Sequence, residues 1–349
     1  MIDNLKYKQD VAAAAGCDLP WEKLNGKSFL ITGASGLIGS FLTDVLMYRN
    51  INNGMNCHVI AMGRSVEKAK AVFGEYMDMD TFSFVSHDIN LPLDSYEGKV
   101  DFLLHLASNT HPVAYSTDPI GTIASNIIGL KNLLDFAAEH GTERFAFASS
   151  NEIYGENRGD TELFDEEYCG YIDCNTLRAG YPESKRCGEA LCQAYRRAKN
   201  MDVVIPRLTR SYGATMLKSD TKAISQFIKK GIAGEDIVLK SEGNQYYSYT
   251  YAPDAVTGLL TVILKGVDGE AYNIADEKSD IRLKDLAALI AGFSGAKVVF
   301  ELPDKTEQLG YSKATKARLD SKKIKALGWQ PVYTIETGIE RTLQILTDK

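Results

Sequence analysis

The sequence contains no run of about 18 apolar residues, the length that an α-helix needs to cross a bilayer. Its first ten residues mix acidic and basic side chains and lack the apolar core of a signal peptide. An excess of basic residues is also missing, since 39 Lys and Arg stand against 46 Asp and Glu, a net charge of −7. Nucleic acids and anionic membranes bind basic surfaces, so the charge argues against both partners. These absences predict a cytoplasmic protein.

Cysteines with the spacing of a metal site are missing too. The six cysteines include two CxxxxC pairs, Cys169 with Cys174 and Cys187 with Cys192. The second pair falls on an expected helix, where five residues turn the chain by about 500° and send the thiols to different faces. Zinc knuckles usually place two to four residues between their cysteines. We therefore expect reduced structural thiols and no metal ion.

Strand-like and helical patterns alternate along the first 208 residues, without internal repeats or low-complexity linkers. This alternation predicts an α/β fold with a parallel sheet and right-handed crossovers. The expected strands are 28–32, 57–62, 81–87, 100–106, 144–149 and 203–208, and the expected helices are 37–49, 65–73, 119–140 and 182–199, after a short helical segment at 3–15.

A glycine-rich turn follows the first expected strand. Gly33, Gly36 and Gly39 connect Thr32 to the helical segment 40–48. We expect Gly33 to allow the turn, Gly36 to let the backbone approach a phosphate, and Gly39 to let helix and strand pack closely. The N–H groups of the helix N-terminus would then bind the anion. The motif predicts a dinucleotide pyrophosphate site that also includes Ser35, Leu37 and Ile38.

The pattern changes beyond residue 210, which predicts a Rossmann-type doubly wound parallel sheet with a smaller C-terminal α/β lobe. That lobe would lie over the carboxyl edge of the sheet, where α/β proteins bind ligands. We expect helices at 220–232 and 254–265, an extended tyrosine-rich segment at 237–252, a strand at 271–274, and further elements at 282–292, 297–301, 322–327 and 334–347. The predicted division is a helical extension 1–25, a nucleotide-binding domain 26–208 to which 254–275 returns, and a substrate-binding lobe 209–253 and 276–349.

Two later segments carry groups suited to acid–base chemistry. Tyr181 and Lys185 are four residues apart at the start of an expected helix and therefore share a face. A nearby ammonium lowers the pKa of a phenol and makes it a usable acid or base. Ser150, at the end of an expected strand, can donate to a substrate oxygen, and Glu152 adds a carboxylate. The alternatives are a solvated helix face and a structural turn.

In this order and at these distances, the motifs resemble the extended short-chain dehydrogenase/reductase family of nucleotide-sugar epimerases, dehydratases and decarboxylases. The resemblance covers about residues 26–345. It rests on Thr32-Gly-x-x-Gly-x-x-Gly39, Asp88, His105-Leu-Ala-Ser108, Asn126-x-x-Gly129, the serine segment 147–155, Tyr181-x-x-x-Lys185 and Leu327-Gly-Trp-Gln-Pro331.

The resemblance implies a role for each matching residue. Tyr181 would take the proton of a substrate hydroxyl while hydride passes to the nicotinamide of NAD(P). Lys185 would bind the nicotinamide ribose and keep Tyr181 acidic, and Ser150 would orient the hydroxyl. Members usually return the hydride, so the net reaction is an isomerisation, elimination or decarboxylation. Further cofactor contacts would come from Asp88 and Ile89 at the adenine end and from Leu106, Ala107 and Ser108 along the channel.

Among these reactions, Asn151 favours decarboxylation or epimerisation. Dehydratases resemble Thr-Asp-Glu where this chain has Ser-Asn-Glu at 150–152, and an asparagine cannot act as an acid. UDP-glucuronate decarboxylases are similar here and along 167–181 and 207–228. Arg178 would then hold a substrate carboxylate through a two-pronged contact, unless it is a surface arginine.

Two positions depart from the family pattern. Arg210 stands where relatives usually have asparagine, and Tyr247 where they have an arginine for the substrate diphosphate. Loss of one charge-assisted contact, about 1.5–3 kcal/mol, would weaken diphosphate binding by one or two orders of magnitude. Either Arg210 restores the charge or the substrate is not a standard nucleotide sugar. Arg318 is a second candidate for a phosphate or carboxylate, and the alternating Tyr247, Tyr249 and Tyr251 form either a stacking wall or strand core.

The cofactor subtype stays open as NAD(P). The second strand ends at Met62 without an acid for an adenine ribose hydroxyl, and Arg64 can meet the 2′-phosphate of NADP.

We expect an enzyme of nucleotide-sugar metabolism, with decarboxylation of a uronic acid ahead of epimerisation. The alternatives are a net NADPH-dependent carbonyl reductase and a non-catalytic nucleotide-sensing module. The resemblance also implies a homodimer through helices 119–140 and 182–199, whose composition equally fits burial against the sheet.

Overall fold

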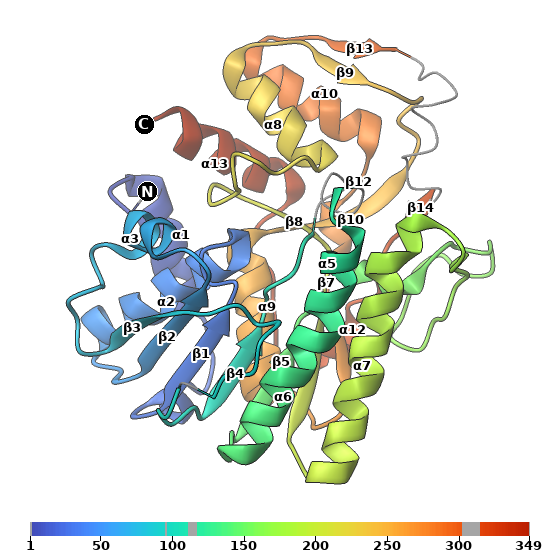
Figure 1. Cartoon of the computed structure of the whole chain (residues 1–349). Helices are drawn as coiled ribbons and strands as arrows, with labels where there is room; N and C mark the ends of the chain where they lie inside the picture. The colour runs from blue at the N-terminus through green and yellow to red at the C-terminus, as the bar shows by residue number, and fades with distance from the viewer. Residues whose placement is uncertain (1, 95, 111–116, 302–314, 349) are drawn as a thin grey trace.

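The computed structural model describes residues 2–94, 96–110, 117–301 and 315–348. Within these ranges an eight-stranded parallel sheet has the order β11-β7-β5-β4-β1-β2-β3, with β6 paired to β7 (Figure 1). The predicted α/β Rossmann-type sheet is confirmed. Its strands are β1 (Ser28–Thr32), β2 (His58–Gly63), β3 (Phe82–Ser86), β4 (Phe102–His105), β5 (Arg144–Phe147), β6 (Ser149–Ser150), β7 (Val203–Leu208) and β11 (Ala271–Ile274).

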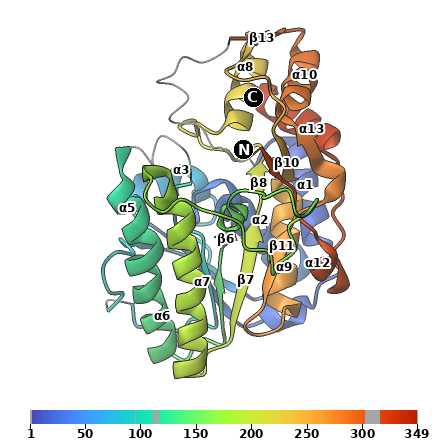
Figure 2. The ribbon, with the colours of Figure 1, turned by 90° about the vertical axis from the view of Figure 1, so that its right-hand side faces the viewer.

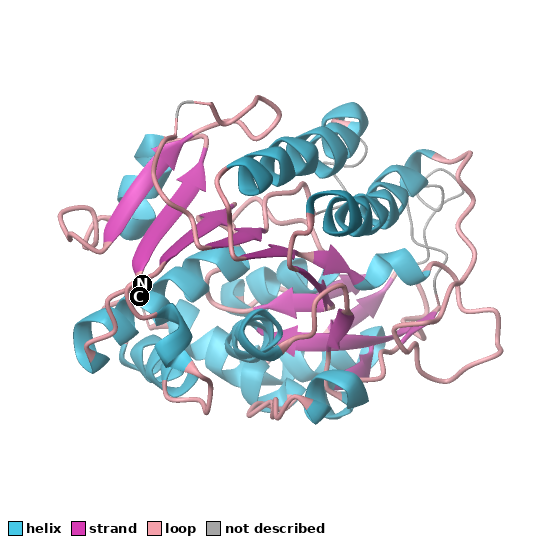
Figure 3. Cartoon of the chain, turned by 90° about the horizontal axis from the view of Figure 1, so that it is seen from below, coloured by secondary structure: helices cyan, strands magenta, loops and turns pink. Residues whose placement is uncertain are grey.

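Helices cover both faces of the sheet (Figure 3), which explains why its strands are almost continuously apolar. Consecutive side chains of β1 serve different cores, because Phe29 and Ile31 pack on one face and Leu30 on the other. One core includes α1 (Leu5–Ala15), α2 (Leu37–Asn53), α3 (Val66–Phe73) and α9 (Ala252–Lys265), and the other includes α6 (Leu130–Glu139) and α7 (Gly180–Lys199).

The helix expected at 119–140 is a composite. It consists of α5 (Pro119–Ala124), a π-helical segment at Ser125–Gly129 and then α6. A π-helical turn adds a residue to the helix and changes the direction of the side chains on it. One of these side chains, Asn126, is fully buried and contacts the candidate site described below.

The C-terminal lobe has its own core and its own strands. In the described part of the chain, β10 (Tyr246–Tyr251) pairs with β8 (Arg210–Tyr212), β12 (Asp280–Arg282) and β14 (Lys316–Ala317), while β9 (Ile237–Leu239) pairs with β13 (Val298–Phe300). The single extended segment expected at 237–252 is therefore two strands in different sheets. The helices of the lobe are α8 (Ala223–Ala233), α10 (Leu283–Ser294) and α13 (Ile335–Thr347), while α12 (Lys322–Ala326) packs on β11 and α9 of the sheet.

The N-terminal helix α1 packs into the body of the molecule, against α2, α9 and α13. Its buried carboxylate, Asp10, accepts hydrogen bonds from Tyr251 Oη at 2.6 Å, Tyr333 Oη at 2.8 Å and Arg341 Nε at 2.6 Å. The chain ends lie side by side (Figures 1 and 3), and Lys6 pairs with Asp348 at 3.0 Å. Helix α1 thus joins the C-terminal lobe to the sheet.

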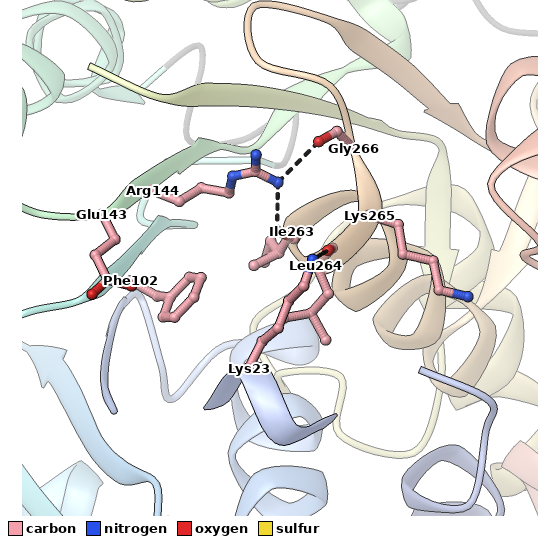
Figure 4. Close-up of a pocket in the computed structure, with 8 residues that line it drawn as sticks. All are labelled: Lys23, Phe102, Glu143, Arg144, Ile263, Leu264, Lys265 and Gly266. Carbon is pink, nitrogen blue, oxygen red and sulfur yellow. Dashed lines mark hydrogen bonds between the residues drawn. The ribbon is translucent and has the colours of Figure 1, made fainter. Parts of the chain in front are cut away.

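A cavity of about 240 Å³ lies near the amino ends of β4 and β5, beside the end of α9 (Figure 4). Arg144 Nη1 donates to the carbonyls of Ile263 at 2.9 Å and Gly266 at 3.0 Å, and Lys23 Nζ donates to that of Leu264 at 2.7 Å. Carbonyls at a helix C-terminus lack partners within the helix, so these cations cap α9. We assign the cavity a structural role.

None of the helices in the described ranges is long and apolar enough to cross a membrane.

Candidate active site

The glycine turn closes tightly between β1 and α2. Gly33 has φ +67°, and a Cβ added there would lie 2.9 Å from the Ala107 backbone. A Cβ on Gly39 would lie 2.7 Å from the Ala34 backbone, so a side chain at either position would clash. Gly36 is the N-cap residue of α2, and no side chain among the described residues caps the helix, which leaves the first helical N–H groups for an anion. This cradle fits the pyrophosphate of a dinucleotide.

Residues after β4 continue the cradle. The Ala107 amide donates to Thr32 Oγ1 at 3.2 Å, and that hydroxyl also contacts His105 Nδ1 at 2.8 Å. Burial lowers the pKa of His105 to about 3, so its imidazole is neutral. These contacts hold Leu106, Ala107 and Ser108 beside the glycine turn.

The residues predicted for the adenine end follow β2 and β3. Arg64 comes directly after Gly63, the last residue of β2, and is exposed. Asp88 is half-buried, and its Oδ1 accepts from the Asn90 amide at 3.0 Å. Ile89 is buried against the π-helical segment, where a Cβ on Gly129 would lie 2.8 Å from its Cδ1. The two segments lie at the carboxyl edge of neighbouring parallel strands.

Three of the four predicted catalytic residues meet where α7 begins beside β6 (Figure 2). Ser150 ends β6 and shares a side-chain hydrogen bond with Tyr181, in the first turn of α7. One turn later, Lys185 Nζ donates to the Ala148 carbonyl at 2.8 Å and lies 4.6 Å from the centre of the Phe147 ring. All three side chains are over 90% buried.

Burial dominates the electrostatics of this group. It raises the pKa of Tyr181 above that of an ordinary phenol, and the charge of Glu152 adds to the rise. The hydrogen bond with Ser150 and the charge of Arg178 act in the opposite direction. Burial also lowers the pKa of Lys185 to about 7. The expected lowering of the Tyr181 pKa is therefore wrong for the protein alone, because desolvation outweighs the groups that lower it, Ser150 and Arg178.

A second polar group lies next to Tyr181. Glu152 follows Ser150 in a 3₁₀ turn, and its carboxylate accepts from Arg178 Nη2 at 2.7 Å. The guanidinium of Arg210 lies 3.7 Å from the centre of the Tyr247 ring. Glu152 and Arg178 influence the pKa values of both Tyr181 and Tyr247, so the two groups form one electrostatic neighbourhood. Asn151, between Ser150 and Glu152, is buried.

Arg318 lies apart from these residues. Its Nε donates to Asp280 at 2.7 Å, and its guanidinium lies 4.6 Å from the centre of the Tyr246 ring. Tyr246 and Tyr247 are consecutive on β10 and point to opposite faces of that strand. The structure therefore places Arg318 and Arg210 on different faces of β10.

The alternating tyrosines of β10 share one face of the strand and lie in the core of the lobe. Tyr249 and Tyr251 are almost fully buried, and Tyr251 packs on Tyr212 with ring centres 5.5 Å apart. All three tyrosines of the expected stacking wall are buried in the core of the lobe, and among them Tyr247 also contacts the guanidinium of Arg210.

A buried hydrogen-bond chain joins the cofactor side to the catalytic helix. Ser108 Oγ donates to Asn126 Oδ1 at 2.9 Å, and Asn126 Nδ2 donates to Ser184 Oγ at 2.9 Å. Ser184 Oγ in turn donates to the Tyr181 carbonyl at 2.8 Å. The sequence contains Asn126 in a motif but gives it no role. The sequence signal for Asn126 was its polar side chain within a largely apolar helical pattern. The π-helical turn that sets the direction of this side chain could not be predicted from the sequence.

The family model described as "NAD dependent epimerase/dehydratase family" matches residues 29–275. This chain belongs to that family. A UDP-glucuronic acid decarboxylase 1 of Xenopus tropicalis is 31% identical over 323 residues, 91% of this chain and 71% of that protein. UDP-glucuronic acid decarboxylase 6 of Arabidopsis thaliana is 30% identical over 315 residues, 89% of this chain and 86% of that protein.

Solved structures of similar fold include other enzymes. A dTDP-glucose 4,6-dehydratase of Streptomyces venezuelae with bound NAD has a TM-score of 0.79 at 24% identity, covering 92% of this family member and 97% of that chain. A UDP-glucose 4-epimerase of Thermotoga maritima has a TM-score of 0.77 at 23% identity, covering 92% and 99%. These likenesses agree with the Rossmann-type architecture.

Proposed function

We propose that this epimerase/dehydratase family member modifies a nucleotide sugar, using tightly bound NAD(P) to oxidise a sugar hydroxyl transiently. The observation that carries the proposal is the burial of Ser150, Tyr181 and Lys185 together beside the glycine cradle. Decarboxylation of a uronic acid is the leading reaction and epimerisation the alternative. The names of the curated relatives and the Ser-Asn-Glu segment support this order.

The residues present suit a dinucleotide. When bound, NAD(P) would supply a hydride acceptor and donor. The turn 33–39 would hold its pyrophosphate, Lys185 its nicotinamide ribose, and Ala107 with Ser108 the channel between them. Arg64, exposed after β2, would meet a 2′-phosphate if the cofactor is NADP. We also propose that residues 26–208 with 254–275 hold the cofactor, and that 209–253 with 276–349 hold the substrate.

Tyr181 would act on the hydroxyl proton. Its phenol oxygen must be ionised to accept that proton, which burial opposes in the protein alone. A positive charge close to the phenol would favour ionisation, and Lys185 is the cation one turn away. Ser150, already hydrogen-bonded to Tyr181, can hold the same substrate oxygen in line. The proton thus moves between the substrate oxygen and Tyr181 Oη.

Oxidation at the carbon β to a carboxylate makes loss of carbon dioxide feasible. The bond between the ring carbon and the carboxyl carbon breaks, its electron pair stays as an enolate, and a proton returns to the ring carbon. Arg178 would contact the carboxylate and Glu152 would hold Arg178 in place. The ketone is then reduced back to a hydroxyl, which gives a UDP-pentose. In epimerisation the bond to the carboxyl carbon stays intact, and the ketone is reduced on its other face.

Product analysis tests the proposal. NMR of a reaction with UDP-glucuronate would show either loss of carbon dioxide with a UDP-pentose or inversion at C4. Tyr181→Phe should lower turnover at least 1,000-fold while UDP binding stays within twofold, because only the acid–base group is removed. Mass spectrometry of the co-purifying nucleotide would identify NAD or NADP.

Three results would contradict the proposal. Stoichiometric consumption of NADPH would indicate the net reductase, and unchanged activity of Tyr181→Phe would indicate a sensing module. Absence of both carbon dioxide release and C4 inversion, with every nucleotide sugar tried, would exclude the reaction type.

A homodimer is the last part of the proposal. Helix α5 and its surroundings expose apolar side chains, of which Ile120 is 82% and Leu177 61% exposed. Ile123 contacts the start of α7 near Gly180, so this apolar surface runs from one helix to the other. Surfaces of this kind mark interaction sites. They support pairing of α5 and α7 with a second copy.

A further inference from the structure

We propose that Arg210, supported on the ring of Tyr247, is the phosphate-binding cation of this active site. The inference rests on the proposed function and adds to it the way the substrate diphosphate is recognised. Arg210 begins β8 and lies opposite Tyr249 in the parallel pairing of β8 with β10. Its guanidinium carbon lies 3.7 Å from the centre of the Tyr247 ring, a cation–π contact that fixes its position.

The hydrogen bonding of Arg210 sets it apart from other arginines of the fold. Arg207, Arg318 and Arg341 each bind a carboxylate, from Glu189, Asp280 and Asp10. Arg210 has no carboxylate partner among the described residues, and its buried Nη1 has no hydrogen-bond acceptor among them. A guanidinium stays charged and presents five donors. A buried donor without an acceptor is unfavourable, and an anionic ligand would remove this deficit.

The surrounding charges favour an anion at this place. Arg178 and Glu152 neutralise each other across 2.7 Å. Arg210 therefore leaves the local charge positive, in a chain whose net charge is −7. The ligand that fits is negatively charged and presents oxygen acceptors to the N–H donors of a planar guanidinium.

The position of Arg210 relative to Tyr181 indicates a phosphate rather than the uronate carboxylate. Arg178 and Glu152 influence both Tyr181, where the sugar hydroxyl reacts, and Tyr247, whereas Arg210 acts on Tyr247 and on Tyr249 beyond it. In a hexuronic acid the reacting C4 and the phosphate-bearing C1 lie at opposite ends of the ring, and the carboxylate is next to C4. Arg178 thus suits the carboxylate, and Arg210 suits the phosphate.

Calorimetric titration with UDP, UDP-glucose and UDP-glucuronate tests this assignment. Arg210→Gln should weaken all three by 10- to 100-fold, because each carries the diphosphate. The matched control is Arg282→Gln. It removes an exposed guanidinium of β12 that lies over Tyr246, the residue before Tyr247 on β10, and it should change each affinity less than twofold. Arg178→Gln should weaken only UDP-glucuronate. Unchanged UDP binding by Arg210→Gln, or a loss confined to UDP-glucuronate, would overturn the inference.

A double variant distinguishes loss of the phosphate contact from misfolding of the Arg210→Gln variant. Arg210→Asn with Tyr247→Arg moves the guanidinium from β8 to the neighbouring strand and should restore UDP binding to within about fivefold of the unaltered chain. Failure to restore it in a variant that melts at the normal temperature would count against the proposal. Lack of UDP binding by the unaltered chain would also overturn it. Tyr181→Phe, with UDP binding kept and turnover lost, tests the proposed function separately.

Discussion

Lys185 is a buried amine whose protonation can be measured through protein stability. Burial lowers its pKa from 10.5 to about 7, with Glu189 and Cys192 as the nearby groups that oppose the fall. Below pH 7 the folded protein carries the buried charge, and the lowered pKa corresponds to a cost of about 5 kcal/mol. Between pH 7 and 10.5 the unfolded chain binds a proton that the folded protein does not. The stability of the folded state therefore rises with pH in this window.

The variant Lys185→Met isolates this effect. The unfolding free energy of the unaltered protein minus that of Lys185→Met should be flat below pH 7 and then rise by about 1.4 kcal/mol per pH unit. Urea denaturation of nucleotide-free protein at pH 6 to 9.5 would measure a rise of about 3 kcal/mol. Lys131→Met, at an exposed lysine paired with Asp135, should show no such slope. A flat difference for Lys185→Met would show that Lys185 titrates like a surface lysine and refute the argument.

Two further variants test the glycine cradle and the apolar surface. Gly39→Ala places a Cβ 2.7 Å from the Ala34 backbone and should weaken NAD(P) binding at least tenfold by fluorescence titration, whereas Gly292→Ala, with open space around it, should leave the affinity unchanged. Equal affinities for both variants would contradict the geometry. Ile120→Asp should convert a dimer to a monomer in sedimentation experiments. A dimer mass that stays unaltered in this variant would show that α5 does not form the contact between subunits.

Local sequence signals were enough to predict the sheet and its glycine turn. The predicted bounds of the first strand, 28–32, and of the strand 271–274 agree with β1 and β11. Both are short apolar segments whose type is set by their own residues and buried faces. The strands β12 and β14 could not be predicted, since they have three and two residues and owe their extended form to pairing with β10.

The site shows the same division between local and tertiary information. Sequence spacing predicted that Tyr181 and Lys185 share a helix face, but the pKa of each depends on burial that only the folded chain creates. Arg318 has the residue type of a phosphate ligand. Its partner Asp280 lies 38 residues away in the sequence. This ion pair, and the alternation of side chains between the two faces of β10, place Arg318 on a different face of the strand from Arg210. The contact of Arg210 with Tyr247 likewise requires two strands to be paired.

The packing of α1 has a consequence for the order in which the chain folds during synthesis. The three donors to Asp10 follow it by 241, 323 and 331 residues. Helix α1 therefore leaves the ribosome with its neighbour α2, but long before the groups that satisfy its carboxylate have been made. A nascent chain that stops before α13 lacks Arg341 and the part of α13 that packs on α1. The earliest helix can complete its contacts only when synthesis is almost complete.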